Sequence, residues 1–129
     1  MEEMINKFKA YPPEEQQKIM DKYRDAIATI YKNIDAEDLK LMLYCLEYLV
    51  KYINENHKDD PKNIKAWCAV VLMRRLKNKS INTEDDINDL IIKTFDHFKK
   101  EEYSIYLQDI AMFSNEYIRD VEYLNKLML

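Results

Sequence analysis

The side chains best suited to metal binding or covalent catalysis are sparse: the chain has two histidines and two cysteines in 129 residues. His57 and His97 belong to no Glu-x-x-His or His-x-x-x-His pair, the spacings that place two ligands on one helix face. Cys45 and Cys68 have no CxxC partner and lie in apolar stretches, which is typical of reduced thiols in a core. The sequence therefore predicts no metal site, no cofactor and no catalytic residue, so we expect a protein that is not an enzyme.

Glycine is absent from the whole chain, although an average usage of about 7% would give about nine glycines. It is the usual residue for backbone with positive φ in tight turns and in loops that bind phosphate. Its absence argues against a Gly-rich nucleotide loop, a nucleophile elbow and tight β-hairpins. Helices joined by short polar connections are the favoured architecture.

Apolar residues recur at spacings of three and four, the period of amphipathic helices. We predict a single domain over residues 1–129, folded as an all-α compact bundle of five main helices with a short helix over 2–11 before them. Pro13, Asp35 and either Asn82 or Thr83 mark helix starts. At three helix ends asparagine is expected to take the left-handed conformation usual for glycine: Asn33, Asn56 and Asn78. The main helices are expected over about 13–33, 36–56, 61–78, from 83, and 101–128.

The segments 36–56 and 61–78 are predicted to be the innermost helices of this bundle. The first is apolar on two faces with a narrow polar strip between them, and the second contains the run AWCAVVLM. A helix that is apolar on two faces must be covered on both. We therefore predict that Leu46 and Val71 are almost fully buried.

Basic residues gather at the end of the segment 61–78. Residues 61–83 carry six basic and no acidic side chains. The flanking segments are acidic, with a net charge of −4 over residues 1–60 and −6 over residues 84–129. Arg74, Arg75, Lys77 and Lys79 form the basic cluster. Cations at a helix C-terminus are favoured by the helix dipole, so solvation of the helix end is the simplest explanation. The alternative is a patch that binds phosphate or an acidic protein surface.

Tyrosines form the second candidate surface. Tyr44, Tyr48 and Tyr52 recur every four residues, and we call them the tyrosine strip. Because Tyr44 lies between Lys40 and Glu47 on the polar side, we expect it to be exposed, or covered by the N-terminal segment or by another chain. Tyrosine is enriched at interfaces, which slightly favours another chain and so a homodimer.

The sequence as a whole favours a non-enzymatic protein-binding module: an inhibitor, immunity factor, adaptor or regulator whose partner is another protein. The second hypothesis is a nucleic-acid-associated regulator that uses the basic cluster, and the third is a helical enzyme.

The longest apolar run in the chain has eight residues, so we expect no membrane span and a cytoplasmic location. Abundant Lys, Asn, Ile, Asp and Tyr are typical of phage, plasmid and other AT-rich genes.

Overall fold

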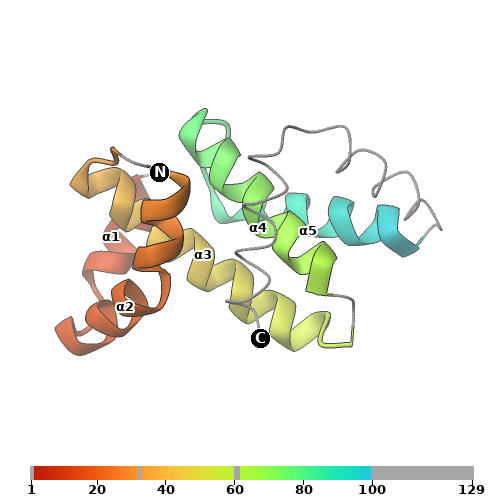
Figure 1. The fold of residues 1–129 in the computed structure, drawn as a ribbon, viewed down its shortest axis with the longest axis horizontal. Helices are drawn as coiled ribbons and strands as arrows, with labels where there is room; N and C mark the ends of the chain where they lie inside the picture. The colour runs from red at the N-terminus through yellow and green to blue at the C-terminus, as the bar shows by residue number, and fades with distance from the viewer. Residues whose placement is uncertain (1, 32, 60–61, 100–129) are drawn as a thin grey trace.

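A computed structural model describes residues 2–31, 33–59 and 62–99, which fold as an all-α bundle (Figure 1). The part of the chain that is described contains no strand. Its helices are α1 (Glu2–Lys9), α2 (Pro13–Ile30), α3 (Ala36–Asn56), α4 (Lys62–Lys77) and α5 (Glu84–Lys99). The predicted fold class is confirmed, and the helix expected over about 101–128 lies outside the described residues.

α3 is the axis of the bundle, because it contacts each of the other four helices that the structure describes. In Figure 1, α1 and α2 lie against its first half, and α4 runs back beside it, so that the end of α4 lies near the start of α3. α5 packs against both α3 and α4. Burial extends almost all round α3 and covers Ile64 to Val70 of α4 without a break. The prediction that these two helices are innermost is therefore confirmed.

Leu46 and Val71 differ in how deeply they lie. Leu46 is 1% exposed, as predicted, but Val71 is only half-buried. Val71 precedes Arg74 and Arg75 by three and four residues, which places it on the one side of α4 that reaches solvent. The expectation for Val71 was wrong because a run of apolar letters hides which side of the helix each residue occupies.

Capping side chains fix the starts of two helices. Asp35 caps α3, since its Oδ1 accepts from the Asp38 backbone N–H at 2.8 Å. Before α5, Thr83 Oγ1 accepts from the Asp86 N–H, while Asp86 Oδ2 accepts from the N–H groups of Asn82 and Thr83. This reciprocal arrangement is a capping box with aspartate in the place of glutamate. The cap predicted at Asp35 and the Thr83 alternative are both confirmed.

The end of α4 departs from the expected pattern by one residue. Lys79, and not Asn78, has positive φ, at 58°. The Ser80 N–H donates to the Arg75 carbonyl and the Lys79 N–H to the Leu76 carbonyl, the two hydrogen bonds of a Schellman motif. α2 and α3 end in residues with negative φ instead. The left-handed conformation expected of the asparagines at 33, 56 and 78 is therefore wrong, because hydrogen bonding and not residue preference selects the residue that reverses the chain.

Lys79→Gly is expected to stabilise the protein by about 1 kcal/mol, because a side chain at this φ brings Cβ close to the following carbonyl. Chemical unfolding at neutral pH measures the change. Lys77→Gly is the matched control: it removes the same charge from the last helical turn, and it should destabilise by about 0.5–1 kcal/mol. Equal effects of the two substitutions would contradict the left-handed assignment.

Candidate protein-binding surface

The tyrosine strip lies largely inside the bundle. Tyr44 is only 7% exposed, and Tyr48 and Tyr52 are half-buried. The Tyr44 ring lies 6.2 Å from that of Tyr11, which follows α1, and 6.4 Å from that of Tyr48. Of the covers considered for Tyr44, the N-terminal segment is the one observed. The slightly favoured cover by another chain is wrong for this residue.

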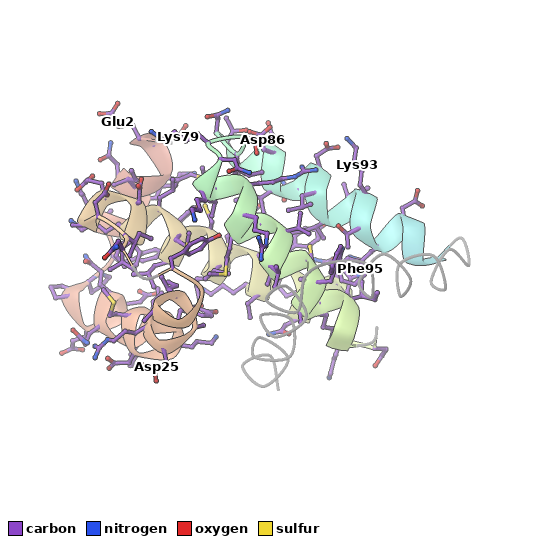
Figure 2. All side chains as sticks on the ribbon, turned by 45° about the horizontal axis from the view of Figure 1, so that its top comes forward. Glu2, Asp25, Lys79, Asp86, Lys93 and Phe95 are labelled. Atoms are coloured by element: carbon purple, nitrogen blue, oxygen red, sulfur yellow. The ribbon has the colours of Figure 1, made fainter. Side chains whose placement is uncertain are left out.

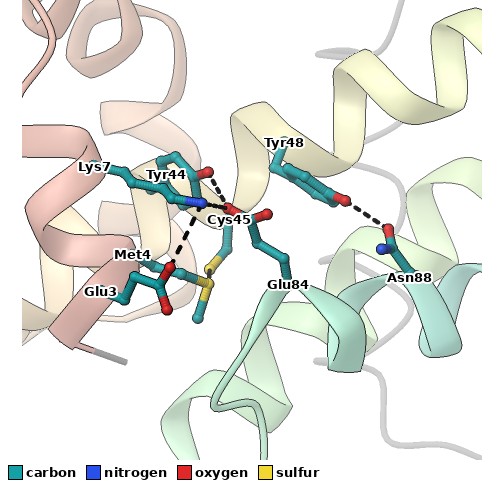
Figure 3. A network of polar contacts seen from close by, with 8 residues as sticks. All are labelled: Glu3, Met4, Lys7, Tyr44, Cys45, Tyr48, Glu84 and Asn88. Carbon is teal, nitrogen blue, oxygen red and sulfur yellow. Dashed lines mark hydrogen bonds and ion pairs between the residues drawn. The ribbon is translucent and has the colours of Figure 1, made fainter.

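Glu84 of α5 joins α1 to α3, as Figure 3 shows. Its Oε1 accepts from the Lys7 ammonium at 2.8 Å and from the Tyr44 hydroxyl at 2.5 Å. Beside it, the Tyr48 hydroxyl donates to Asn88 Oδ1 at 2.6 Å. The Lys7 ammonium, and then the Tyr44 hydroxyl, lower the pKa of Glu84. Two tyrosines that were candidates for partner binding therefore hold the bundle together.

Glu84→Gln is expected to weaken the protein at neutral pH and to matter less in acid. The folded-state pKa of Glu84 lies below its ordinary value of 4.5, so the folded protein binds this proton less readily than the unfolded chain. The resulting stability is present above that ordinary value and is lost as the pH falls through the lower folded-state pKa. Urea unfolding from neutral to strongly acidic pH measures the difference in free energy of unfolding between wild type and Glu84→Gln. This difference should become smaller in acid, and it should also be smaller at neutral pH when both proteins carry Lys7→Gln. A difference that does not depend on pH contradicts the prediction.

The basic cluster lies at the end of α4 and in the turn that follows. Arg75, Lys77 and Lys79 are exposed, and Arg74 is half-buried. Figure 2 shows Lys79 at the edge of the molecule that also carries Glu2 and Asp86, with Asp25 at the opposite edge. The Lys77 ammonium lies 5.0 Å from the centre of the Tyr31 ring, within the range of a cation–π contact.

A small pocket opens between the basic cluster and the start of α3. Its volume is about 90 Å³, well below the roughly 300–1,000 Å³ of typical small-molecule sites. Leu41, Met42 and Leu76 form an apolar floor. The lining comprises Tyr31, Asn33, Ile34, Asp38, Leu41, Met42, Leu76, Lys77 and Lys79. A pocket of this size and lining suits a single apolar side chain with a charged group beside it.

No family model matches the chain, and neither does any curated protein or solved structure.

Within residues 2–31, 33–59 and 62–99, no helix has both the length and the hydrophobicity to cross a membrane. Among the same residues, no three histidine, cysteine or acidic side chains are grouped to hold a metal ion. Burial raises the pKa of Cys45 and of Cys68 to about 12, so both thiols are protonated at neutral pH.

Sequence reasoning found two of the residues that line this pocket and missed the rest. Lys77 and Lys79 belong to the predicted basic cluster, whereas Tyr31 and Asp38 were not among the candidate binding residues. The charge of Lys79 acts on the carboxylates of Asp35 and Asp38, although these lie more than 40 positions away in the sequence. No short-range sequence pattern indicates that Lys79 lies near Asp35 and Asp38, because their proximity depends on how α4 returns beside α3.

Proposed function

We propose that the protein is a non-enzymatic protein-binding module, an adaptor, inhibitor, immunity factor or regulator whose partner docks at the end of α4. The observation that carries this proposal is the apolar pocket with Lys77 and Lys79 at its rim. Interfaces gain most of their affinity from a few anchor side chains that fill such pockets, while charges on the rim select the partner. The expected anchor is an apolar side chain beside an aspartate or glutamate.

A protein partner fits this surface better than nucleic acid does. The pocket includes the carboxylate of Asp38 beside its two lysines, and the whole chain carries a net charge of −4. Nucleic-acid binding draws its affinity from neutralising many phosphates, which calls for an extended basic surface. An apolar floor, in contrast, stabilises binding only when it receives an apolar group.

The test is capture of partners from cells that express the gene, with two double variants of equal charge change. Lys77→Glu with Lys79→Glu reverses both rim charges, whereas Lys18→Glu with Lys93→Glu reverses two exposed charges on α2 and α5. We expect wild type and the second variant to retain the same protein, and the first variant to lose it. Both should unfold within about 1 kcal/mol of wild type, since surface charges contribute little to stability.

Two results would contradict the proposal. The first is equal capture by the rim variant and the control variant. The second is capture that nuclease treatment abolishes, together with retention on duplex DNA or RNA that falls steeply with salt. That second result would support the nucleic-acid hypothesis.

A further inference from the structure

We infer that the pocket is one end of a longer groove along α2, and that this groove binds an acidic amphipathic helix of the partner protein. This inference rests on the proposed function and adds to it the shape and charge of the docking segment. Three adjoining hollows make up the groove, and neighbouring hollows share residues. The first two share Tyr31, Asn33 and Ile34, and the second and third share Met20 and Leu39.

One wall of the groove is a single face of α2. Its residues recur at steps of one, three and four, which keeps them on one side of a helix. They are Pro13, Gln16, Gln17, Met20, Arg24, Ile27, Ala28 and Tyr31, the last just beyond the helix end. The other wall comes from Asp35, Ala36, Leu39 and Lys40, at the start of α3. The groove therefore follows most of the length of α2.

The length and lining of the groove favour a helix over other peptide shapes. From Gln16 to Ala28 the groove spans about 18 Å, or about three turns of a docked helix. An extended peptide needs a free sheet edge, and the described part of the chain has no strand. A polyproline peptide needs a row of aromatic rings, whereas most of this lining is aliphatic or polar. The apolar stripe of an amphipathic helix fits such a groove at its spacings of three and four.

The middle of the groove is apolar and only partly covered. Met20, Ile34 and Leu39 are half-buried, and Ala28 is exposed. Methionine adapts its shape to an incoming side chain, so Met20 can pack against different apolar groups. The small side chain of Ala28 leaves room for a helix to approach α2 closely.

The charges around the groove select an acidic helix. Four cationic side chains and two carboxylates line it, but Arg24 pairs with Asp21 and Lys40 with Glu37, so the positive charge offered to a partner lies at the end of the groove with Lys77 and Lys79. One of those carboxylates, Asp35, already accepts the capping hydrogen bond at the start of α3. The cations are Arg24, Lys40, Lys77 and Lys79. Glutamates flanking an apolar stripe would meet Lys77 and Lys79 at the α4 end of the groove.

The experiment is selection of binders from a displayed library of peptides of about 15 residues, long enough to fill the groove as a helix. The wild-type chain is the bait, and the selected peptides are then titrated against two variants. Ala28→Trp fills the groove, and Lys18→Trp places the same bulk on an exposed position of α2 outside it. Circular dichroism melting of both variants confirms that they fold.

We expect acidic peptides with apolar residues at spacings of three and four. They should bind wild type and Lys18→Trp alike and lose at least about tenfold in affinity for Ala28→Trp, a change of about 1.4 kcal/mol. A proline in the middle of the peptide should abolish binding, because it breaks the helix. Peptides that are basic, that tolerate the proline, or that bind Ala28→Trp undiminished would overturn the inference, as would the failure to select any binder.

Sedimentation of the wild-type chain over a concentration series tests a second copy as the occupant. A dimer that Ala28→Trp dissociates would assign the groove to self-association and overturn the inference. The proposed function fails separately, through the capture experiment with Lys77→Glu and Lys79→Glu. Partner capture that needs those lysines but survives Ala28→Trp would leave the proposed function standing and would reject the helix groove.

Discussion

Leu46→Ala is expected to lower the free energy of unfolding by about 2–5 kcal/mol. The Leu46 side chain is 1% exposed and lies midway along α3, which contacts α1, α2, α4 and α5. Shortening it removes apolar contacts and leaves a cavity that neighbouring helices cannot close without shifting. Urea unfolding monitored by circular dichroism measures the loss, with an unchanged slope showing that the unfolded state is not altered.

Val71→Ala is the matched control for that prediction. It also shortens an aliphatic side chain in an inner helix, but Val71 is only half-buried. We expect it to cost at most about 1 kcal/mol, because a surface-facing site relaxes around a smaller side chain. Losses of equal size at the two positions would contradict the assignment of α3 as the axis of the bundle.

Tyr44→Glu is expected to destabilise the protein by about 3–5 kcal/mol at neutral pH, because it buries a second carboxylate beside Glu84, and the Lys7 ammonium cannot neutralise both. Tyr44 packs against Tyr11, which follows α1, and its hydroxyl donates to the Glu84 carboxylate. The substitution buries a second carboxylate beside the first, and their repulsion adds to the cost of removing a charge from water. Thermal and urea unfolding measure the loss.

The pH dependence and a second substitution distinguish the effect of the introduced charge on stability from the effect of lost packing. Burial and the Glu84 carboxylate should raise the folded-state pKa of the introduced carboxyl group, so its penalty is largest at neutral pH and shrinks as the pH falls. Tyr44→Phe keeps the ring and removes only the hydrogen bond to Glu84, at a cost of about 1–3 kcal/mol. If Tyr44→Glu proved as stable as Tyr44→Phe at neutral pH, the burial of Tyr44 under the N-terminal segment would be disproved.

The helix starts could be predicted from the sequence because their causes are local. Pro13 fixes its own backbone, and Asp35 caps a helix whose N–H groups lie two or three residues away. The central position of α3 was also predictable, since apolar residues on two faces require cover on both. These signals act within one or two turns, so a single sequence carries them in full.

The candidate site could not be predicted in the same way, because its parts meet only after the helices pack. The basic cluster was found from charge alone, whereas the pocket beside it needs the return of α4 beside α3. Tyr44 was correctly placed on the polar side of its helix, but no local rule shows that α1 covers that side. Its acceptor, Glu84, lies 40 residues away, and Lys7 lies 77 residues from the same carboxylate.

The separation of 77 residues between Lys7 and Glu84 sets an order of events on the ribosome. At a synthesis rate of about 5–20 residues per second, Glu84 emerges about 4–15 s after Lys7. α1 and the middle of α3 are therefore synthesised before Glu84, whose carboxylate accepts the hydrogen bond of the Tyr44 hydroxyl. Until then the Tyr44 hydroxyl has no Glu84 carboxylate to donate to, so the contacts that join α1, α3 and α5 at this point form only after α5 has been made.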